Sequence, residues 1–127
     1  MSSKQTIFAF VDAINAHDVA ALAQLMSDDH TFIDAHGNKV SGREQMLAGW
    51  RSYFAWFPDY SIEVTDVFEG EELFGLFGYA GGSFKGNSEQ SWRLPAAWKA
   101  VVQNDRVTLW QVFADTKIPF EIIERNG

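Results

Sequence analysis

The stretch SGREQMLAGWRSYFAWFP, residues 41–58, decides how the rest of the chain can fold. Ser41 and Glu44 have the spacing of a capping box, in which two side chains close the first turn of a helix. Apolar residues then recur at helical spacing until Pro58, which cannot continue a helix. These residues are Met46, Trp50, Tyr53, Phe54 and Phe57. The stretch therefore predicts an amphipathic helix that buries an aromatic stripe.

Two further helices are predicted before this stretch. Ser2 and Gln5 form another capping-box pair, and the apolar stripe behind them predicts a helix over residues 3–15. Asp18 is placed to cap a short, alanine-rich helix over residues 19–26. The N-terminal part of the chain is therefore expected to supply three helices.

Strands are predicted between and after the helices. The segment HTFIDA alternates apolar and polar residues and ends in the turn His36-Gly37-Asn38, from which Lys39 and Val40 return as a hairpin. Asn104-Asp105 is a tight hairpin turn between the last two strands. The predicted strands span residues 30–35, 60–69, 73–80, 93–103 and 106–114. Asp115 is expected to cap a terminal helical turn, from which Phe120, Ile122 and Ile123 dock.

This order of elements predicts an α+β fold. Long antiparallel strands twist strongly, and helices that precede them pack on one face of the sheet. Gly75, Gly78, Gly81 and Gly82 are expected to mark bends. The sequence therefore predicts a cone-like, curved, mixed or antiparallel sheet wrapped around three N-terminal helices and enclosing a pocket. A chain of 127 residues is sufficient for one domain, which we place at residues 1–127.

Composition excludes several classes of partner. Ten Lys and Arg against seventeen Asp and Glu give a net charge of −7, which repels phosphate backbones and anionic lipid. Nucleic acid and membrane are therefore not expected partners. The chain has no Cys, and the spacing of His30, Asp34 and His36 matches no familiar metal motif, so no metal is expected. The N-terminal segment lacks the features of a signal peptide, which favours a cytoplasmic location.

The aromatic content is unusually high, with eleven Phe, five Trp and three Tyr. These rings can fill one thick core, or they can line a cavity for an apolar ligand. Helical and strand spacing predicts which side chains face inward. The expected ligand-binding residues are Phe10, Phe32, Trp50, Tyr53, Phe54, Trp98, Trp110 and Val112.

Asp34 is the first candidate for catalysis, because alternation places it on the same sheet face as His30 and Phe32. Burial beside aromatic rings would raise the pKa of its carboxyl group toward the range useful for acid and base chemistry. The alternative is that Asp34, three residues before Gly37, caps the turn. His30 is the second catalytic candidate, since imidazole titrates near neutrality. It could equally be an ordinary surface histidine.

The order of these segments resembles that of the nuclear-transport-factor-2-like superfamily, which includes ketosteroid isomerase and the SnoaL-like polyketide cyclases. The resemblance rests on FVDAINAHDVAALAQLM, on HTFIDAHG followed by SGREQM, on FPD, and on RVTLWQVFAD. It implies a cone-shaped fold with a hydrophobic pocket. It also implies an isomerase or cyclase that needs no cofactor and moves a proton on a small, apolar or cyclic carbonyl compound.

The resemblance also assigns individual positions. The catalytic base of ketosteroid isomerase falls on Asp34, while its oxyanion-hole Tyr falls on Phe10, which has no hydroxyl group. The partner carboxylic acid falls near Ala97 or Trp98, so another donor would have to bind an enolate oxygen. The water-activating Asp of related epoxide hydrolases falls on Val112, so that chemistry is not implied.

Three functions therefore stay open from the sequence. The first is a proton-moving enzyme with Asp34 as acid or base, and the second is a binding protein for an apolar metabolite. The third is a dimeric assembly module with a filled core. In each case the superfamily resemblance implies a homodimer, formed through the outer sheet face. That face carries Lys99, Val101, Gln103, Thr108 and Gln111.

Overall fold

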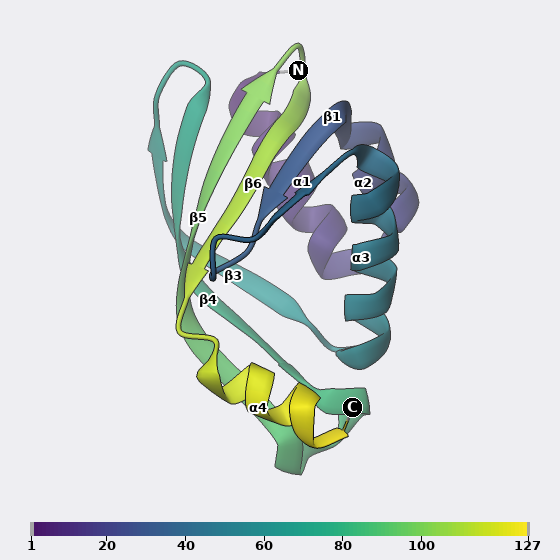
Figure 1. The fold of residues 1–127 in the computed structure, drawn as a ribbon. Coiled ribbons are helices and arrows are strands. Elements are labelled where there is room, and N and C mark those ends of the chain that lie inside the picture. The colour runs from purple at the N-terminus through teal and green to yellow at the C-terminus, as the bar shows by residue number, and fades with distance from the viewer. Residues whose placement is uncertain (1, 127) are drawn as a thin grey trace.

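The computed structural model describes residues 2–126, which form one curved sheet wrapped around helices (Figure 1). The helices are α1 (Ser3–Ala16), α2 (Val19–Leu25), α3 (Arg43–Trp56) and α4 (Lys117–Asn126), with two short 3₁₀ turns, η1 (Phe84–Gly86) and η2 (Ser88–Gln90). The strands are β1 (Met26–Ile33), β2 (Lys39–Ser41), β3 (Ser61–Glu69), β4 (Leu73–Ser83), β5 (Ser91–Gln103) and β6 (Arg106–Ala114).

The six strands form one mixed sheet in the order β2-β1-β6-β5-β4-β3. Only the β1–β6 pair is parallel among the described pairs, and the others are antiparallel. The sheet curves around α1 and α3 without closing (Figure 1). The predicted α+β class and the curved sheet are therefore confirmed.

The predicted start signals of α1 and α2 are confirmed. The Gln5 backbone N–H donates to the Ser2 hydroxyl at 3.1 Å, and the Ser2 backbone N–H donates to the Gln5 side chain at 2.8 Å. Asp18 accepts a hydrogen bond of 3.0 Å from the backbone N–H of Ala21. Both caps satisfy backbone donors that the first turn of a helix leaves unpaired.

The capping box predicted for α3 is wrong. Ser41 lies in β2, where it pairs with Thr31 of β1, so its side chain does not cap the helix. Gly42 occupies the N-cap position with φ of +102°, a conformation that glycine adopts without steric strain. The sharp change from strand to helix thus requires glycine, and the pairing of Ser41 takes precedence over its local capping preference.

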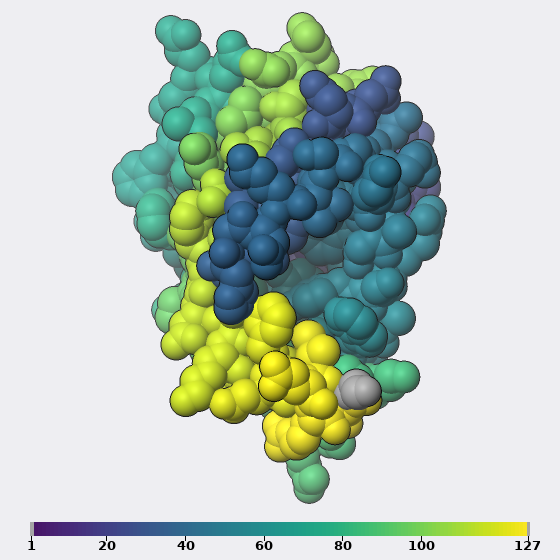
Figure 2. Space-filling view, viewed as in Figure 1, coloured from purple at the N-terminus to yellow at the C-terminus, as the bar shows by residue number. Residues whose placement is uncertain are grey.

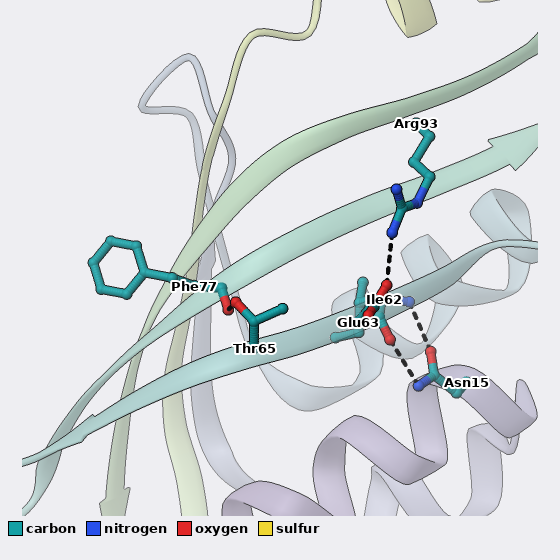
Figure 3. A network of polar contacts seen from close by, with 6 residues as sticks. All are labelled: Asn15, Ile62, Glu63, Thr65, Phe77 and Arg93. Carbon is teal, nitrogen blue, oxygen red and sulfur yellow. Dashed lines mark hydrogen bonds and ion pairs between the residues drawn. The ribbon is translucent and has the colours of Figure 1, made fainter.

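The predicted bend at Gly78 is also confirmed. The register of β3 against β4 shifts between Val64 and Asp66, so that Thr65 forms a bulge. The Thr65 hydroxyl donates to the carbonyl of Phe77 at 3.1 Å (Figure 3). A Cβ atom at Gly78 would lie 1.7 Å from the backbone oxygen of Glu63. The two strands therefore approach each other more closely here than any other residue type allows.

Asn15 joins the end of α1 to the first residues of β3. Its side-chain oxygen accepts from the backbone N–H of Ile62 at 2.8 Å, and its amide donates to the carbonyl of Ile62 at 3.0 Å (Figure 3). Together these two hydrogen bonds satisfy the backbone N–H and the carbonyl of Ile62, which lies in the edge strand β3. They fix the position of α1 relative to the concave face of the sheet.

The C-terminal segment is more extensive than the sequence predicted. Asp115 accepts from the backbone N–H of Lys117 at 3.1 Å, but it lies one residue before the N-cap position, which Thr116 occupies, and a helix of ten residues follows. α4 lies across the open end of the curved sheet, below α3 (Figure 1). Ile122 is buried, and Ile123 is partly buried against the core. Phe120 is 43% exposed and meets the His36 ring at 4.9 Å, so it docks at the β1–β2 turn and not in the core.

Candidate functional site

The seven aromatic residues and Val112 that were predicted to face inward do lie inside the curved sheet. Five are buried, with exposed fractions of 0% for Phe10, 6% for Trp50, 9% for Phe54, 2% for Trp98 and 1% for Trp110. The other three, Phe32, Tyr53 and Val112, are half-buried and pack against this core. The structure therefore brings all eight predicted side chains to one interior.

Ring contacts join α1 to the sheet in this interior. The Phe10 ring centroid lies 4.9 Å from Trp110 and 6.1 Å from His30. Trp98 stacks on Trp110 with a centroid distance of 6.3 Å. On α3, Trp50 stacks on Phe54 at 5.3 Å. Of the two positions near which the resemblance places a carboxylic acid, Ala97 and Trp98, the second is occupied by a buried indole.

Two cavities open on the surface, with volumes of about 710 and 470 Å³. The larger lies between α2, the start of α3 and the β5–β6 turn, and the smaller beside the first residues of β3. Neither is lined by Trp50, Phe54, Trp98 or Trp110. These four rings form part of the buried core, and a pocket that opens among them stays a prediction.

His30 is buried completely on the inward side of β1, with an exposed fraction of 0%. Its Nδ1 lies 2.7 Å from the carbonyl oxygen of Val107. Since a carbonyl oxygen only accepts, Nδ1 carries the hydrogen, and Nε2 of the neutral ring has a free lone pair. Nε2 is buried and has no hydrogen-bond partner in the protein. The ring is therefore fixed at one nitrogen and has an unpaired acceptor at the other.

Burial also sets the charge of His30. Desolvation lowers the pKa of the imidazole below its ordinary value, against the opposing effects of the Val107 hydrogen bond and the negative charge of Asp29. The ring is therefore neutral at pH 7. A neutral imidazole with a bare Nε2 is a base, and the same nitrogen becomes an acid after it takes up a proton.

The carboxylate of Asp34 is occupied by the β1–β2 turn. Its Oδ1 accepts from the backbone N–H groups of His36 and Asn38, both at 2.9 Å, and its Oδ2 accepts from the Asn38 side chain at 3.2 Å. The Asp34 backbone N–H also donates to the carbonyl of Asn38 at 2.9 Å. These are the contacts of a turn-capping aspartate, the alternative that the sequence left open.

The expected rise in the pKa of Asp34 is wrong. Desolvation does raise the pKa of this carboxyl group, but the hydrogen bonds from Asn38 and His36 outweigh it, and the net pKa is lowered. The sequence could not show this, because the donors become available only when the turn has folded. Asp34 is thus ionised at neutral pH and held away from proton chemistry by three donors.

A stability prediction follows for Asp34. Asp34→Ala is expected to lower the free energy of unfolding at pH 7 by about 1–2 kcal/mol, because two backbone N–H groups lose a charged acceptor. Because the pKa of Asp34 is lower in the folded state than in the unfolded state, its ionised carboxylate stabilises the folded protein at pH values above the unfolded-state pKa. This stabilisation is lost as the pH falls through the two pKa values. The difference between wild type and Asp34→Ala should therefore shrink toward about pH 3 in urea unfolding experiments.

Asp28→Ala is the matched control for that measurement. The Asp28 side chain is 91% exposed and pairs with Arg43 at 3.0 Å. Exposed ion pairs contribute little, so this variant should unfold almost as the wild type does. Equal losses in the two variants, or a loss at Asp34 that does not depend on pH, would contradict the role assigned to the Asp34 carboxylate.

α4 is attached to the rest of the molecule near both of its ends. His36 Nε2 is hydrogen-bonded to the Thr116 hydroxyl at 2.7 Å, and the His36 ring meets the edge of Phe120 at 4.9 Å. At the other end the side chain of Asn126 donates to that of Gln90 in η2. The surface is hollowed where the β1–β2 hairpin, α3 and α4 meet (Figure 2).

A second aromatic group lies at the C-terminal end of α3, and its members Tyr60 and Trp92 were not singled out from the sequence. Phe57 contacts Tyr53 at 5.0 Å and Trp92 at 5.6 Å, and Tyr60 contacts Trp92 at 6.0 Å. Burial raises the pKa of both tyrosine hydroxyl groups, so both stay protonated. The FPDY segment was the available signal, since Pro58 turns the chain between Phe57 and Tyr60.

Two classes of site are not found within residues 2–126. No group of three or more His, Cys, Asp or Glu side chains in this range is arranged to hold a metal ion. Within the same range, no helix has both the length and the apolar character needed to cross a membrane.

Comparison with known proteins gives one family match. The family model described as "SnoaL-like domain" matches residues 7–118, which is most of the chain. No curated protein matches the chain by sequence.

Solved structures share the fold at low sequence identity. A candidate SnoaL-like polyketide cyclase from a Jannaschia species superposes with a TM-score of 0.82 at 19% identity, covering 95% of this chain and 90% of that one. IdmH, a candidate polyketide cyclase from Streptomyces antibioticus, gives 0.79 at 19% identity, with 98% and 99% covered. A protein from Catenulispora acidiphila with a ketosteroid isomerase-like fold, in complex with trimethylamine, gives 0.76 at 22% identity, with 85% and 83% covered.

Proposed function

Because this chain belongs to the SnoaL-like family, we propose that it binds a small, largely apolar carbonyl compound in its aromatic interior and moves a proton on it, with His30 as acid and base. The observation that carries the proposal is the unpaired Nε2 of His30, in a fully buried ring whose centroid lies 6.1 Å from that of Phe10. A buried acceptor without a partner costs roughly 1–3 kcal/mol, so its retention is favoured where a ligand uses it.

The chemistry requires few groups. His30 Nε2 takes a proton from the carbon beside the carbonyl group, the pair of electrons of the C–H bond forms a C=C bond, and the carbonyl oxygen becomes an enolate. The imidazolium then returns the proton to the same carbon or to another one. In a cyclase the enolate carbon would instead attack a second carbonyl carbon, and the imidazolium would protonate the new alkoxide. Neither route needs a cofactor.

Asp34 has a supporting part in this proposal. It orders the turn that follows β1, and the same turn supplies His36, which contacts α4. In this proposal the proton-carrying role that the sequence favoured for Asp34 passes to His30, which lies four residues earlier in β1.

Solvent deuterium incorporation into 2-tetralone tests this proposal. This bicyclic ketone is apolar and has acidic hydrogens beside its carbonyl group, so NMR in D₂O follows each proton transfer without a complete reaction. The protein is expected to accelerate exchange above the rate in buffer, and to do so saturably. Exchange at the buffer rate, with 2-tetralone bound, would contradict the enzyme and support the second candidate.

The second candidate is a non-catalytic binding protein for an apolar metabolite. It is favoured by the complete burial of His30, since a solvent-free imidazole regains protons slowly. Such a protein would bind 2-tetralone and leave its hydrogens in place. The assembly module, in contrast, would bind no apolar ligand, because its aromatic core would stay closed.

We also propose that the outer sheet face pairs with a second copy of the chain. Phe77 of β4, Ala97 of β5 and Phe113 of β6 lie in one row across the strands of this face, and Phe68 meets Phe77 at 5.7 Å. Phe77 is 47% exposed, Phe113 is 48% exposed and Phe68 is 64% exposed. A contiguous apolar band of this kind is unusual on a monomer surface.

Phe77→Asp tests the pairing. The wild type is expected to sediment as a dimer of twice the 14.3 kDa chain mass, and the variant as a monomer. A carboxylate buried at the centre of the interface should weaken the association by at least about 2 kcal/mol. Phe8→Gln, on the exposed side of α1, is the control and should stay dimeric. A wild type that sediments as a monomer would contradict the pairing.

A further inference from the structure

The aromatic interior is closed in the structure, so a ligand can reach it only if part of the protein moves. The rings of Trp50, Phe54, Trp98 and Trp110 each have an exposed fraction of 9% or less. Neither of the two surface cavities described above is lined by any of them. A ligand that meets His30 Nε2 must therefore enter through a conformation in which one element has left its place.

Three of the four helices are held too firmly to be that element. α3 buries four residues, among them Trp50 and Phe54. α1 buries six residues, and its Asn15 forms two hydrogen bonds with Ile62 of β3. α2 packs against α1, α3, β1 and β6, which confine it. Moving α1 or α3 would expose much of the apolar core to water, which is unfavourable in free energy.

α4 is attached much more weakly. Of its ten residues, Pro119 and Ile122 are buried, and Ile123 packs partly against the core. Ile118 is 47% exposed and Phe120 is 43% exposed. A helix of about ten residues is marginal in water unless tertiary packing supports it. α4 is therefore the helix whose detachment costs the least free energy.

The contacts at the two ends of α4 differ in what they join. At the start, His36 of the β1–β2 turn is hydrogen-bonded to the Thr116 hydroxyl at 2.7 Å. At the far end, the exposed amide of Asn126 donates to the side chain of Gln90 in η2. Gln90 lies two residues before Trp92, a member of the second aromatic group. Because water competes for an exposed hydrogen bond, the Asn126–Gln90 contact adds little to the attachment of α4.

We propose that α4 is a lid over the aromatic interior, which opens when the Asn126–Gln90 contact breaks and Ile122 and Ile123 leave the core. α4 lies across the open end of the curved sheet, so this movement uncovers the core side chains beneath it (Figure 1). The contact of His36 with Thr116 persists and acts as the hinge. The inference rests on the proposed function, for which it names the route of the ligand. Closure of the lid then excludes water from the bound ligand.

Native-state hydrogen exchange of the free protein tests the lid without any ligand. The backbone amides of Ile122 and Ile123 should exchange at least about 10²-fold faster than those of Phe10 and Val11 in α1, after correction for intrinsic rates. Their exchange should also depend little on low concentrations of urea, since the opening exposes little surface. Amides of α4 that are protected as strongly as those of α1 would overturn the lid.

A reversible cross-link tests whether the ligand needs this opening. The chain has no Cys, so Gln90→Cys with Asn126→Cys supplies the two thiols for a short, reducible bis-methanethiosulfonate reagent. Cross-linking should slow the binding of 2-tetralone, followed by stopped-flow quenching of Trp fluorescence, by at least about tenfold. Reduction with dithiothreitol should restore the rate.

The matched control cross-links Glu63→Cys to Arg93→Cys. These two side chains also touch, at 2.6 Å, but they join β3 to β5 and leave α4 free. This variant should bind 2-tetralone equally fast when cross-linked and when reduced. Equal rates for the cross-linked and the reduced Gln90/Asn126 variant would overturn the lid and leave the ligand site intact. A wild type that binds no 2-tetralone would overturn the proposed function, and hydrogen exchange would then decide on the lid alone.

Discussion

Replacing His30 with glutamine is expected to slow deuterium exchange of 2-tetralone by roughly 10²- to 10⁴-fold, the usual contribution of a positioned base. Glutamine can still donate an amide hydrogen toward Val107, as His30 Nδ1 does now, but its amide accepts no proton at neutral pH. The variant should therefore fold, bind 2-tetralone and fail to exchange its hydrogens. NMR of the 2-tetralone signals follows both the binding of the ketone and the exchange of its hydrogens.

The comparison variant is Asp34→Asn, which keeps the shape of the turn-capping side chain and removes its charge. Exchange in this variant should stay within a few-fold of the wild type, because Asp34 already gives its oxygens to the turn. The reverse result, with exchange lost in Asp34→Asn and retained in His30→Gln, would return the role of base to Asp34 and contradict the geometry described here.

The largest effect on stability is expected from Gly78→Ala. The added Cβ would lie 1.7 Å from the backbone oxygen of Glu63 and 3.0 Å from the Cα of Val64. No side-chain rotation relieves a contact with backbone, so β3 and β4 must separate at the bulge. We expect a loss of at least about 3 kcal/mol in the free energy of unfolding, which corresponds to a fall in Tm of roughly 10 °C.

Gly75→Ala is the control within the same strand. A Cβ at Gly75 would meet the Phe77 ring at 3.9 Å, an ordinary contact, and alanine has less backbone entropy to lose than glycine. Its Tm should therefore stay close to that of the wild type or rise slightly. A Gly78→Ala protein as stable as Gly75→Ala would contradict the close approach of β3 and β4 at Gly78.

Much of this fold follows from local sequence. Ser2, Gln5 and Asp18 cap helices by contacts within four residues, and the turn Asn104-Asp105 has positive φ at both positions, as a tight hairpin requires. These caps and this turn can be predicted from the sequence because the interacting residues are close together in the chain. The N-cap of α3 was predicted wrongly, because the sequence did not show that the β1–β2 hairpin extends to Ser41, which pairs with Thr31.

For the candidate site, the sequence predicted which side chains face the interior but not the protonation states of Asp34 and His30. Spacing along strands and helices placed the aromatic side chains correctly, because it depends only on which face is buried. The protonation states of Asp34 and His30 depend instead on donors and carbonyls brought in by folding, among them Val107, which is 77 residues from His30. The signal that distinguishes the two residues is therefore tertiary.

The state of the His30 ring can be measured directly by ¹H–¹⁵N correlation NMR of the histidine side chains. The account predicts a neutral ring at pH 7 with the hydrogen on Nδ1, a pKa below the ordinary value of histidine, and an Nε2 resonance that moves when 2-tetralone is added. An imidazolium ring, a hydrogen on Nε2, or an Nε2 resonance unchanged by saturating 2-tetralone would contradict it.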